Sequence, residues 1–167
     1  MSELKREIEQ KFGGRLRTRV NGILIKDEKL LMVRHKMGEG KIFWNVPGGG
    51  MKYGSSAEQN VIREFKEETG LVVDVNEFLF IHEFLNPPLH AIELFFEVKE
   101  MAGQLELGGD PELSPSYQVI DDIRYLSVDE IKILGKGEVH DVFLGINSIK
   151  DVRMWKGYFN FENNSIK

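Results

Sequence analysis

The chain of 167 residues contains no cysteine, so disulfide bonds, thiolate nucleophiles and thiolate zinc sites are excluded. This absence fits a reducing compartment, and we expect a cytoplasmic protein. A long apolar run is also missing. Residues 1–13 mix lysine and arginine with glutamate, and no later segment has the apolar length of a signal peptide or a membrane-spanning helix. We therefore expect a soluble protein that has no membrane partner.

Positive charge is scarce too, with 22 lysine and arginine residues against 27 aspartate and glutamate residues and a net charge of -5. A chain of this balance lacks the broad basic surface that binds a nucleic-acid backbone, so long nucleic acids are not expected as partners. The hydrophobic content of 41% is sufficient for a core. Since no repeat or linker interrupts the chain, we expect one domain spanning residues 1–167.

Hydrophobic periodicity predicts an α/β protein. Residues 2–12 form a short peripheral helix, and the apolar segments 15–25 and 30–33 flank a polar turn at 26–29, which we interpret as a hairpin. Ser127, with Glu130 three residues later, is predicted to cap a helix. Further strands are predicted at 41–46, 71–75, 78–84, 91–98 and 123–126, and a final helix at 140–149.

Three consecutive glycines, Gly48–Gly50, follow Pro47 between a predicted strand and a predicted helix. Without Cβ atoms, their backbone amides can approach a phosphate closely. The helix should end at Gly70 and begin after either Ser55 or Ser56, because each of these serines has a Glu or Gln three residues later.

On that helix, Glu64, Glu67 and Glu68 stand at positions i, i+3 and i+4, which places three carboxylates on one face. Each like-charged pair costs about 3 kcal/mol at separations of about 5 to 6 Å and an effective dielectric near 20. A hard divalent cation such as Mg²⁺ would offset this repulsion. The alternative is a solvated charged face, with Arg63 and Lys66 close by. The preceding glycines favour a metal site that holds a phosphate.

The segment from Gly49 to Leu71 resembles the Nudix box, the signature of the Nudix hydrolase family. After Gly49, Ser55 stands where the family normally has its first glutamate, which leaves full activity open. The flanking segments 43–49 and 123–131 also resemble the family. The remaining positions follow the family pattern in unbroken register: Arg63, Glu64, Phe65, Lys66, Glu67, Glu68, Thr69, Gly70 and Leu71.

This resemblance implies an α/β/α sandwich around a mixed β-sheet. It also implies Mg²⁺-dependent hydrolysis, with Mn²⁺ as a possible substitute, of the pyrophosphate bond that links a nucleoside diphosphate to another group. Pro87, sixteen residues after Leu71, resembles the branch that cleaves ADP-ribose, so the expectation leans to ADP-ribose or another nucleotide sugar. A homodimer is a further expectation from the family.

In the family, residues equivalent to Glu64, Glu67 and Glu68 hold the metal, and Arg63 would orient the loop and the glutamates. The general base is either Glu64 or an acid outside the box. Three such acids are candidates: Glu93, Glu97 and Glu112. Glu112 ranks first among them because it lies in the long loop of residues 103–117, although an ordinary solvated loop acid is the favoured interpretation of this residue.

The glycines Gly48, Gly49 and Gly50 are predicted to contact the substrate. Arg34 and Trp44 are candidates for a nucleoside pocket, with a strand-end charge and core packing as the respective alternatives. No role is assigned to His82 or His90. The aromatic tail at residues 150–167 is predicted to dock on the domain or on a second subunit, through Trp155, Tyr158, Phe159 and Phe161.

Two other functions compete with hydrolysis. A nucleotide-sensing domain without turnover would explain Ser55, but it has less need of three clustered glutamates. An isopentenyl diphosphate isomerase shares the fold, but the thiol used in that chemistry is absent here.

Overall fold

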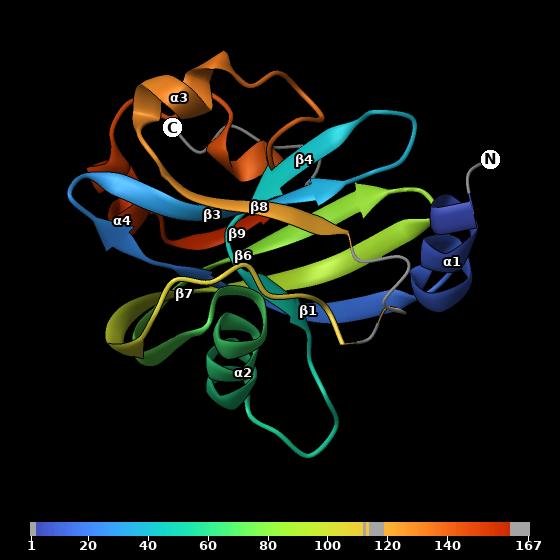
Figure 1. Cartoon of the computed structure of the whole chain (residues 1–167), viewed down its shortest axis with the longest axis horizontal. Helices are drawn as coiled ribbons and strands as arrows, with labels where there is room; N and C mark the ends of the chain where they lie inside the picture. Colours follow the sequence, from blue (N-terminus) through green and yellow to red (C-terminus); the bar gives the residue numbers. More distant parts are fainter. Residues whose placement is uncertain (1–2, 112, 114–118, 161–167) are drawn as a thin grey trace.

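The computed structural model describes residues 3–111, 113 and 119–160 (Figure 1). Its helices are α1 (Glu3–Phe12), α2 (Ala57–Thr69), α3 (Val128–Ile133) and α4 (Ile149–Met154), with a short 3₁₀ helix at Asp141–Phe143. Its strands are β1 (Leu16–Ile23), β2 (Ile25–Lys26), β3 (Lys29–Lys36), β4 (Ile42–Asn45), β5 (Gly48–Gly50), β6 (Leu71–Asn86), β7 (Leu89–Gly103), β8 (Ile120–Leu126) and β9 (Gly157–Asn160).

The larger sheet is mixed and has the strand order β5-β1-β7-β6-β9. β1 runs parallel to β7 and β9 parallel to β6, while the β1–β5 and β6–β7 pairs are antiparallel. The predicted strands at 71–75 and 78–84 are one strand, β6, whose pairing with β7 shifts register between Val75 and Glu77. The mixed sheet implied by the family resemblance is confirmed, and it places the glycine strand β5 at an edge.

The second sheet contains β2, β3, β4 and β8, with β8 paired to β3. The predicted hairpin between residues 15–25 and 30–33 is present only next to its turn, where Ile25 pairs with Leu30. Most of its predicted first strand is β1, which pairs with β5 and β7 in the other sheet. The actual hairpin joins the two-residue strand β2 to β3. Its turn residues Asp27 and Glu28 both have positive φ values, 51° and 56°, as a type I′ turn requires.

Helix α2 packs on one face of these strands. Its buried residues Val61 and Phe65 contact a cluster that includes Val20, Phe96 and Val98. Gly22 is required in β1, because a Cβ atom there would lie 2.2 Å from the Phe65 ring. Figure 1 shows α2 and α3 on opposite sides of the strands, as expected for an α/β/α arrangement.

The predicted helix at 140–149 is wrong. Only Asp141–Phe143 forms a short 3₁₀ helix, Gly145 then adopts a φ of +75°, and α4 begins at Ile149 after the capping residue Ser148. The left-handed conformation of Gly145 interrupts a continuous helix. Phe143 and Ile146 are buried in the second core cluster, so apolar residues in a connecting segment had resembled a helical pattern.

The part of the aromatic tail that the structure describes, up to Asn160, packs on its own domain, which is one of the two predicted alternatives. β9 pairs with β6, and Trp155 and Phe159 each contact the Phe80 ring edge-on with ring centroids 5.8 Å apart. Tyr158 is more exposed, and Phe161 lies outside the described residues. Among the helices that the structure describes, none has the length and apolar character needed to cross a membrane.

Candidate active site

The glycine strand β5 leads through a short loop into α2. Ser56 caps the helix, accepting a hydrogen bond from the Gln59 backbone at 3.1 Å, and the Gln59 side chain accepts one from the Ser56 backbone at 2.9 Å. Of the two predicted caps, the one formed by Ser56 is therefore present. Ser55 is exposed and lies one residue before the cap.

A buried asparagine ties the loop to the helix. Asn60 Oδ1 accepts a hydrogen bond from the Lys52 backbone at 2.9 Å, and Asn60 Nδ2 donates to the Ser56 carbonyl at 2.7 Å. Arg63 Nη2 donates to the same Asn60 oxygen and to the Gly50 carbonyl, both at 3.0 Å. Asn60 was not among the residues predicted for the site. Its only signal was a polar residue beside the apolar arc that contains Val61.

Arg63 also links two of the predicted metal ligands. Its guanidinium lies 2.7 Å from Glu64 Oε1 and 2.9 Å from Glu67 Oε2. Glu68 Oε2 accepts a hydrogen bond from the Gly48 backbone at 3.0 Å. Glu64 and Glu68 are only 6% and 4% exposed, so the alternative of a solvated charged face does not describe them.

Burial makes these two carboxylates costly to ionise. It is the main cause that raises the pKa of Glu64 from 4.5 to about 7; the Arg63 charge opposes this rise, and the Glu67 charge adds to it. Burial likewise raises the pKa of Glu68 well above its usual value, with a further rise from the Glu64 charge. A cation placed among these carboxylates would reverse both effects.

The residues present fit a divalent cation bound by oxygen ligands. Each of the three glutamates uses one carboxylate oxygen in its contacts with the described residues and keeps a second oxygen. Gly49 leaves the space that this arrangement needs, because a Cβ atom there would lie 2.4 Å from the Glu64 carboxyl carbon. At Gly48, a Cβ atom would lie 2.2 Å from the Val20 carbonyl oxygen.

The loop after β7 is bound to the last turn of α2. The backbone nitrogens of Gly108 and Gly109 donate to the carbonyl oxygens of Glu68 and Glu67, at 2.9 and 3.2 Å. A Cβ atom on Gly108 would lie 1.9 Å from the Glu67 carbonyl oxygen, so this close approach requires glycine. The predicted base Glu112 is further along this loop, outside the described residues.

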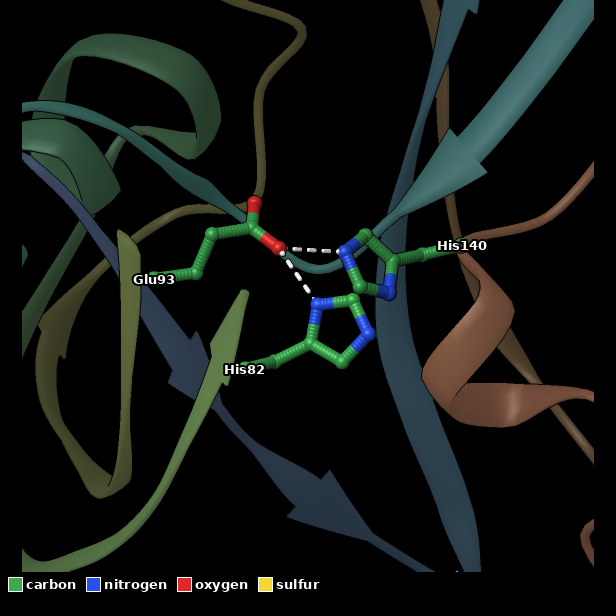
Figure 2. Close-up of side chains that lie close together, drawn as sticks. All are labelled: His82, Glu93 and His140. Carbon is green, nitrogen blue, oxygen red and sulfur yellow. Dashed lines mark hydrogen bonds and ion pairs between the residues drawn. The ribbon is translucent and has the colours of Figure 1, made fainter. Parts of the chain in front are cut away.

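The other two candidate bases already have hydrogen-bonding or ion-pair partners. Glu93 Oε2 contacts His82 Nδ1 at 3.1 Å and His140 Nε2 at 2.6 Å (Figure 2). Glu97 is paired with Arg153 on α4 and accepts a hydrogen bond from Asn76. Burial works to raise the pKa of Glu93, but His140, His82 and the Arg19 charge together hold it below its usual range. A carboxylate stabilised in this way is a poor proton acceptor.

Arg34 and Trp44 have the contacts expected of the two alternatives to substrate binding, which are a charge at a strand end and packing in the core. Arg34 forms a bidentate ion pair with Asp121, in which Nε donates to Oδ1 at 2.8 Å and Nη2 donates to Oδ2 at 3.1 Å. Trp44 is 4% exposed and belongs to the core cluster opposite α2. Pro87 lies in the turn between β6 and β7.

Comparison with known proteins supports the family resemblance of the segment Gly49–Leu71. The model of the NUDIX domain matches residues 15–144. An ADP-ribose pyrophosphatase from Methanocaldococcus jannaschii is 32% identical over 117 residues, which are 69% of either chain.

Two solved structures share the fold. A NUDIX hydrolase from Nitrosomonas europaea has a TM-score of 0.61 and 21% identity, with 71% of this chain and 77% of that one covered. An ADP-ribose pyrophosphatase from Streptococcus suis has a TM-score of 0.57 and 19% identity, with 86% and 98% covered. The matching family model, the mixed sheet and the box residues around Arg63 lead to one conclusion: the chain belongs to the Nudix family and is a pyrophosphohydrolase.

Proposed function

We propose that this enzyme hydrolyses the pyrophosphate bond of a nucleoside diphosphate derivative in a Mg²⁺-dependent reaction, with ADP-ribose or another nucleotide sugar as its substrate. One observation carries the proposal: Glu64 and Glu68 are buried beside the glycine strand, where a divalent cation would compensate their charge and attract a phosphate. The names of the Methanocaldococcus and Streptococcus relatives support the choice of ADP-ribose.

In this proposal Glu64, Glu67 and Glu68 hold Mg²⁺, or Mn²⁺ in its place. The bound ion would neutralise charge on the diphosphate and lower the pKa of a water molecule. Arg63 positions Glu64 and Glu67 through its two ion pairs and fixes the loop through the Gly50 carbonyl.

Substrate contacts are assigned to the backbone of Gly48–Gly50 and, for the nucleoside, to the surface of β3 and β4 around Arg34 and Trp44. The Arg34 side chain is 27% exposed and Trp44 only 4%, so a base would contact Arg34 more than Trp44. Glu64 and Glu112 remain the proposed alternatives for the general base. A cytoplasmic location and a homodimer also belong to the proposal, and sedimentation velocity would test the dimer.

The test is a Mg²⁺-supplemented hydrolysis panel of ADP-ribose, other nucleotide sugars, dinucleoside polyphosphates and nucleoside triphosphates. Glu67→Gln and Glu68→Gln should each lower kcat by at least about 100-fold, because charge stabilisation at the reacting phosphate is lost. Glu58→Gln is the matched control, because Glu58 is exposed on the same helix. This control should remain within about twofold of the wild type, as is usual for surface substitutions.

A folded wild type that binds nucleotides but hydrolyses none of these compounds would support the alternative, a nucleotide-sensing domain. The exposed Ser55 in place of the family's first glutamate is the feature that favours this alternative. Hydrolysis that survives a chelator and both glutamine substitutions would contradict the proposed site.

A further inference from the structure

A row of polar side chains crosses the larger sheet from the glycine strand inward. Gly50 on β5 pairs with Arg19 on β1, Arg19 with Glu93 on β7, and Glu93 with His82 on β6. Neighbours in such a row point to the same face of a sheet. Val20, the next residue on β1, packs against α2, so Arg19 and its row lie on the opposite face.

The inner end of this row is a buried hydrogen-bond network. Glu93, His82 and His140 are 3%, 2% and 1% exposed, and both histidines contact Glu93 Oε2 (Figure 2). Within the described part of the chain, this is the one group of three histidine or carboxylate side chains whose ligand atoms all lie within 4.8 Å of one another. A metal ion and a structural network are therefore the two interpretations to separate.

The second nitrogen of His140 decides between them. His140 Nδ1 accepts a hydrogen bond from the Val142 backbone at 3.2 Å, so this nitrogen carries no proton. The proton then lies on Nε2, which donates it to Glu93. A metal-bound histidine instead donates its outer N–H to an acceptor. The geometry is that of a network that fixes the Glu93 carboxylate, and a metal is not needed to explain it.

The outer end of the row is unsatisfied. Arg19 Nε lies 3.7 Å from Glu93 Oε1, and the Arg19 guanidinium makes no hydrogen bond to any residue that the structure describes. Yet its side chain is only 24% exposed. Arg34 and Arg63, which are similarly buried, each donate several hydrogen bonds. A largely buried guanidinium with unused donors is suited to an anion from solution.

The surroundings of Arg19 place that anion beside the proposed metal site. Arg19 is paired with Gly50 of β5, and the same strand of three glycines contacts Glu68 through the Gly48 nitrogen and lies against the Glu64 carboxyl group at Gly49. Asn21, two residues along β1 on the same face, pairs with Gly48, and its buried amide atoms find no partner among the described residues. Two neighbouring side chains on this face thus have unused polar atoms.

We propose that Arg19 binds a phosphate oxygen of the substrate diphosphate and that Glu93, fixed by His82 and His140, is the positioning residue that orients Arg19. This inference rests on the proposed function, since it supplies the diphosphate with a cationic contact on the opposite side of the glycine strand from α2. Arginine suits this role because its planar fork can hold two phosphate oxygens at once.

The experiment compares Arg19→Gln and Arg19→Lys with the wild type in two assays. The first measures hydrolysis, with Mg²⁺, of the best substrate in the panel. The second measures binding of α,β-methylene-ADP, a nucleoside diphosphate analogue, by calorimetry in the presence of a chelator. Arg153→Gln is the matched control, because it removes an arginine paired with Glu97, four residues from Glu93 on the same strand.

Arg19→Gln should lower kcat/KM and probe affinity by about 10- to 100-fold, as expected when a charged hydrogen bond is lost. Arg19→Lys should recover part of both, and Arg153→Gln should change them by no more than about twofold. Unchanged probe affinity in Arg19→Gln, or a folded wild type that does not bind the probe, would overturn the inference. Probe binding that depends on Arg19 in a protein without turnover would overturn the proposed function alone.

The role of Glu93 needs a readout beyond stability. Glu93→Gln should weaken probe binding in the wild-type background but not in the Arg19→Gln background, because it acts through Arg19. His140→Gln provides a second test of the same coupling if Glu93→Gln does not fold. If Glu93→Gln lowers probe affinity by the same factor in both backgrounds, the positioning role is contradicted. It is also contradicted if the wild type binds one equivalent of a transition metal that His140→Gln does not bind.

Discussion

Glu68 and Glu93 are equally buried, at 4% and 3% exposure, yet their pKa values move in opposite directions. Glu68 has one backbone donor, Gly48, and a like-charged neighbour, Glu64. Glu93 has two histidines and Arg19 around it. The charge of a buried carboxylate is therefore decided by its partners, because burial works in the same direction at both residues.

This difference in partners distinguishes the α2 glutamates, whose charge needs a bound ligand, from Glu93, whose charge is compensated within the protein. The α2 glutamates form a cluster with excess negative charge, as expected of a site that binds a cation and, through it, a phosphate. The Glu93 network already satisfies its carboxylate from within the protein. The His82, Glu93 and His140 side chains lie close enough together to bind a metal ion. Because they already satisfy one another, they need a metal less than the α2 glutamates do.

The largest expected effect is a contrast in stability between two glutamine substitutions, both measured without metal. Glu93→Gln should lower the free energy of unfolding by about 3 to 5 kcal/mol, the usual cost of removing one member of a buried charge network. Glu68→Gln should leave the free energy of unfolding unchanged or raise it, because it removes a desolvated charge. Urea denaturation at pH 7 measures both, and a similar loss in the two variants would remove the distinction.

The pH dependence of stability sharpens the same comparison. The pKa of Glu64 rises from 4.5 to about 7 on folding, so the folded state binds more protons and stability falls as pH rises through this window. With chelator present, the fall should be on the order of 2 to 3 kcal/mol. Glu68, whose pKa is also raised, adds to this fall, so the fall should be smaller but not absent in Glu64→Gln, and Mg²⁺ should reduce it in the wild type.

Glu93 should produce the opposite trend at acid pH. Because its folded pKa is depressed, its contribution is present above the unfolded value of 4.5 and is lost as pH falls toward the folded pKa. Glu93→Gln should therefore flatten the acid side of the stability profile and leave the decline between pH 4.5 and 7 intact. The assignment would be refuted if Glu64→Gln flattened the acid side of the stability profile and Glu93→Gln flattened the decline between pH 4.5 and 7.

An intermediate effect is expected from Gly49→Ala. The added Cβ atom would lie 2.4 Å from the Glu64 carboxyl carbon, so Glu64 must move from its place beside the glycine strand. We expect kcat to fall by about tenfold or more, since small displacements of a catalytic group have large costs. Gly135→Ala is the control, because its Cβ would approach only the end of the Glu138 side chain, at 3.3 Å. Comparable kinetics in the two variants would show that Gly49 does not shape the site.

The smallest effect is expected from Ser55→Glu, which restores the glutamate usual in the family. Ser55 is exposed and precedes the helix cap, so a carboxylate there would gain only a few tenths of a kcal/mol from the helix N-terminus. We expect kcat to change by less than about threefold. A gain of 100-fold would show that the missing glutamate belongs to the metal site after all.

The contiguous part of the site could be predicted from the sequence. Arg63, Glu64, Glu67 and Glu68 lie within two helical turns, so helical periodicity alone brings them together. The Ser56 cap is equally local. Gly48–Gly50 were predicted only as a glycine segment between a strand and a helix, and their pairing with β1 as strand β5 was not predicted. The family resemblance supplied the sandwich, and the structure confirms its mixed sheet.

The errors and omissions depend on distant pairing. Strand β1 was assigned to a hairpin because its neighbour in sequence was apolar, whereas its partner β7 lies about 70 residues away. For the same reason Glu93, His82 and His140 gave no recognisable spacing, although they meet in one network. Arg19 had no signal at all, since an unsatisfied guanidinium is recognised only when its surroundings are known.

The most direct test of the account is to locate the divalent ion by Mn²⁺ electron paramagnetic resonance titration. We expect the wild type to bind Mn²⁺ and Glu67→Gln and Glu68→Gln to weaken this binding by at least about tenfold. Folded His140→Gln should bind Mn²⁺ like the wild type. Retention of Mn²⁺ by both glutamate variants, with its loss in His140→Gln, would contradict the account and move the metal site to Glu93.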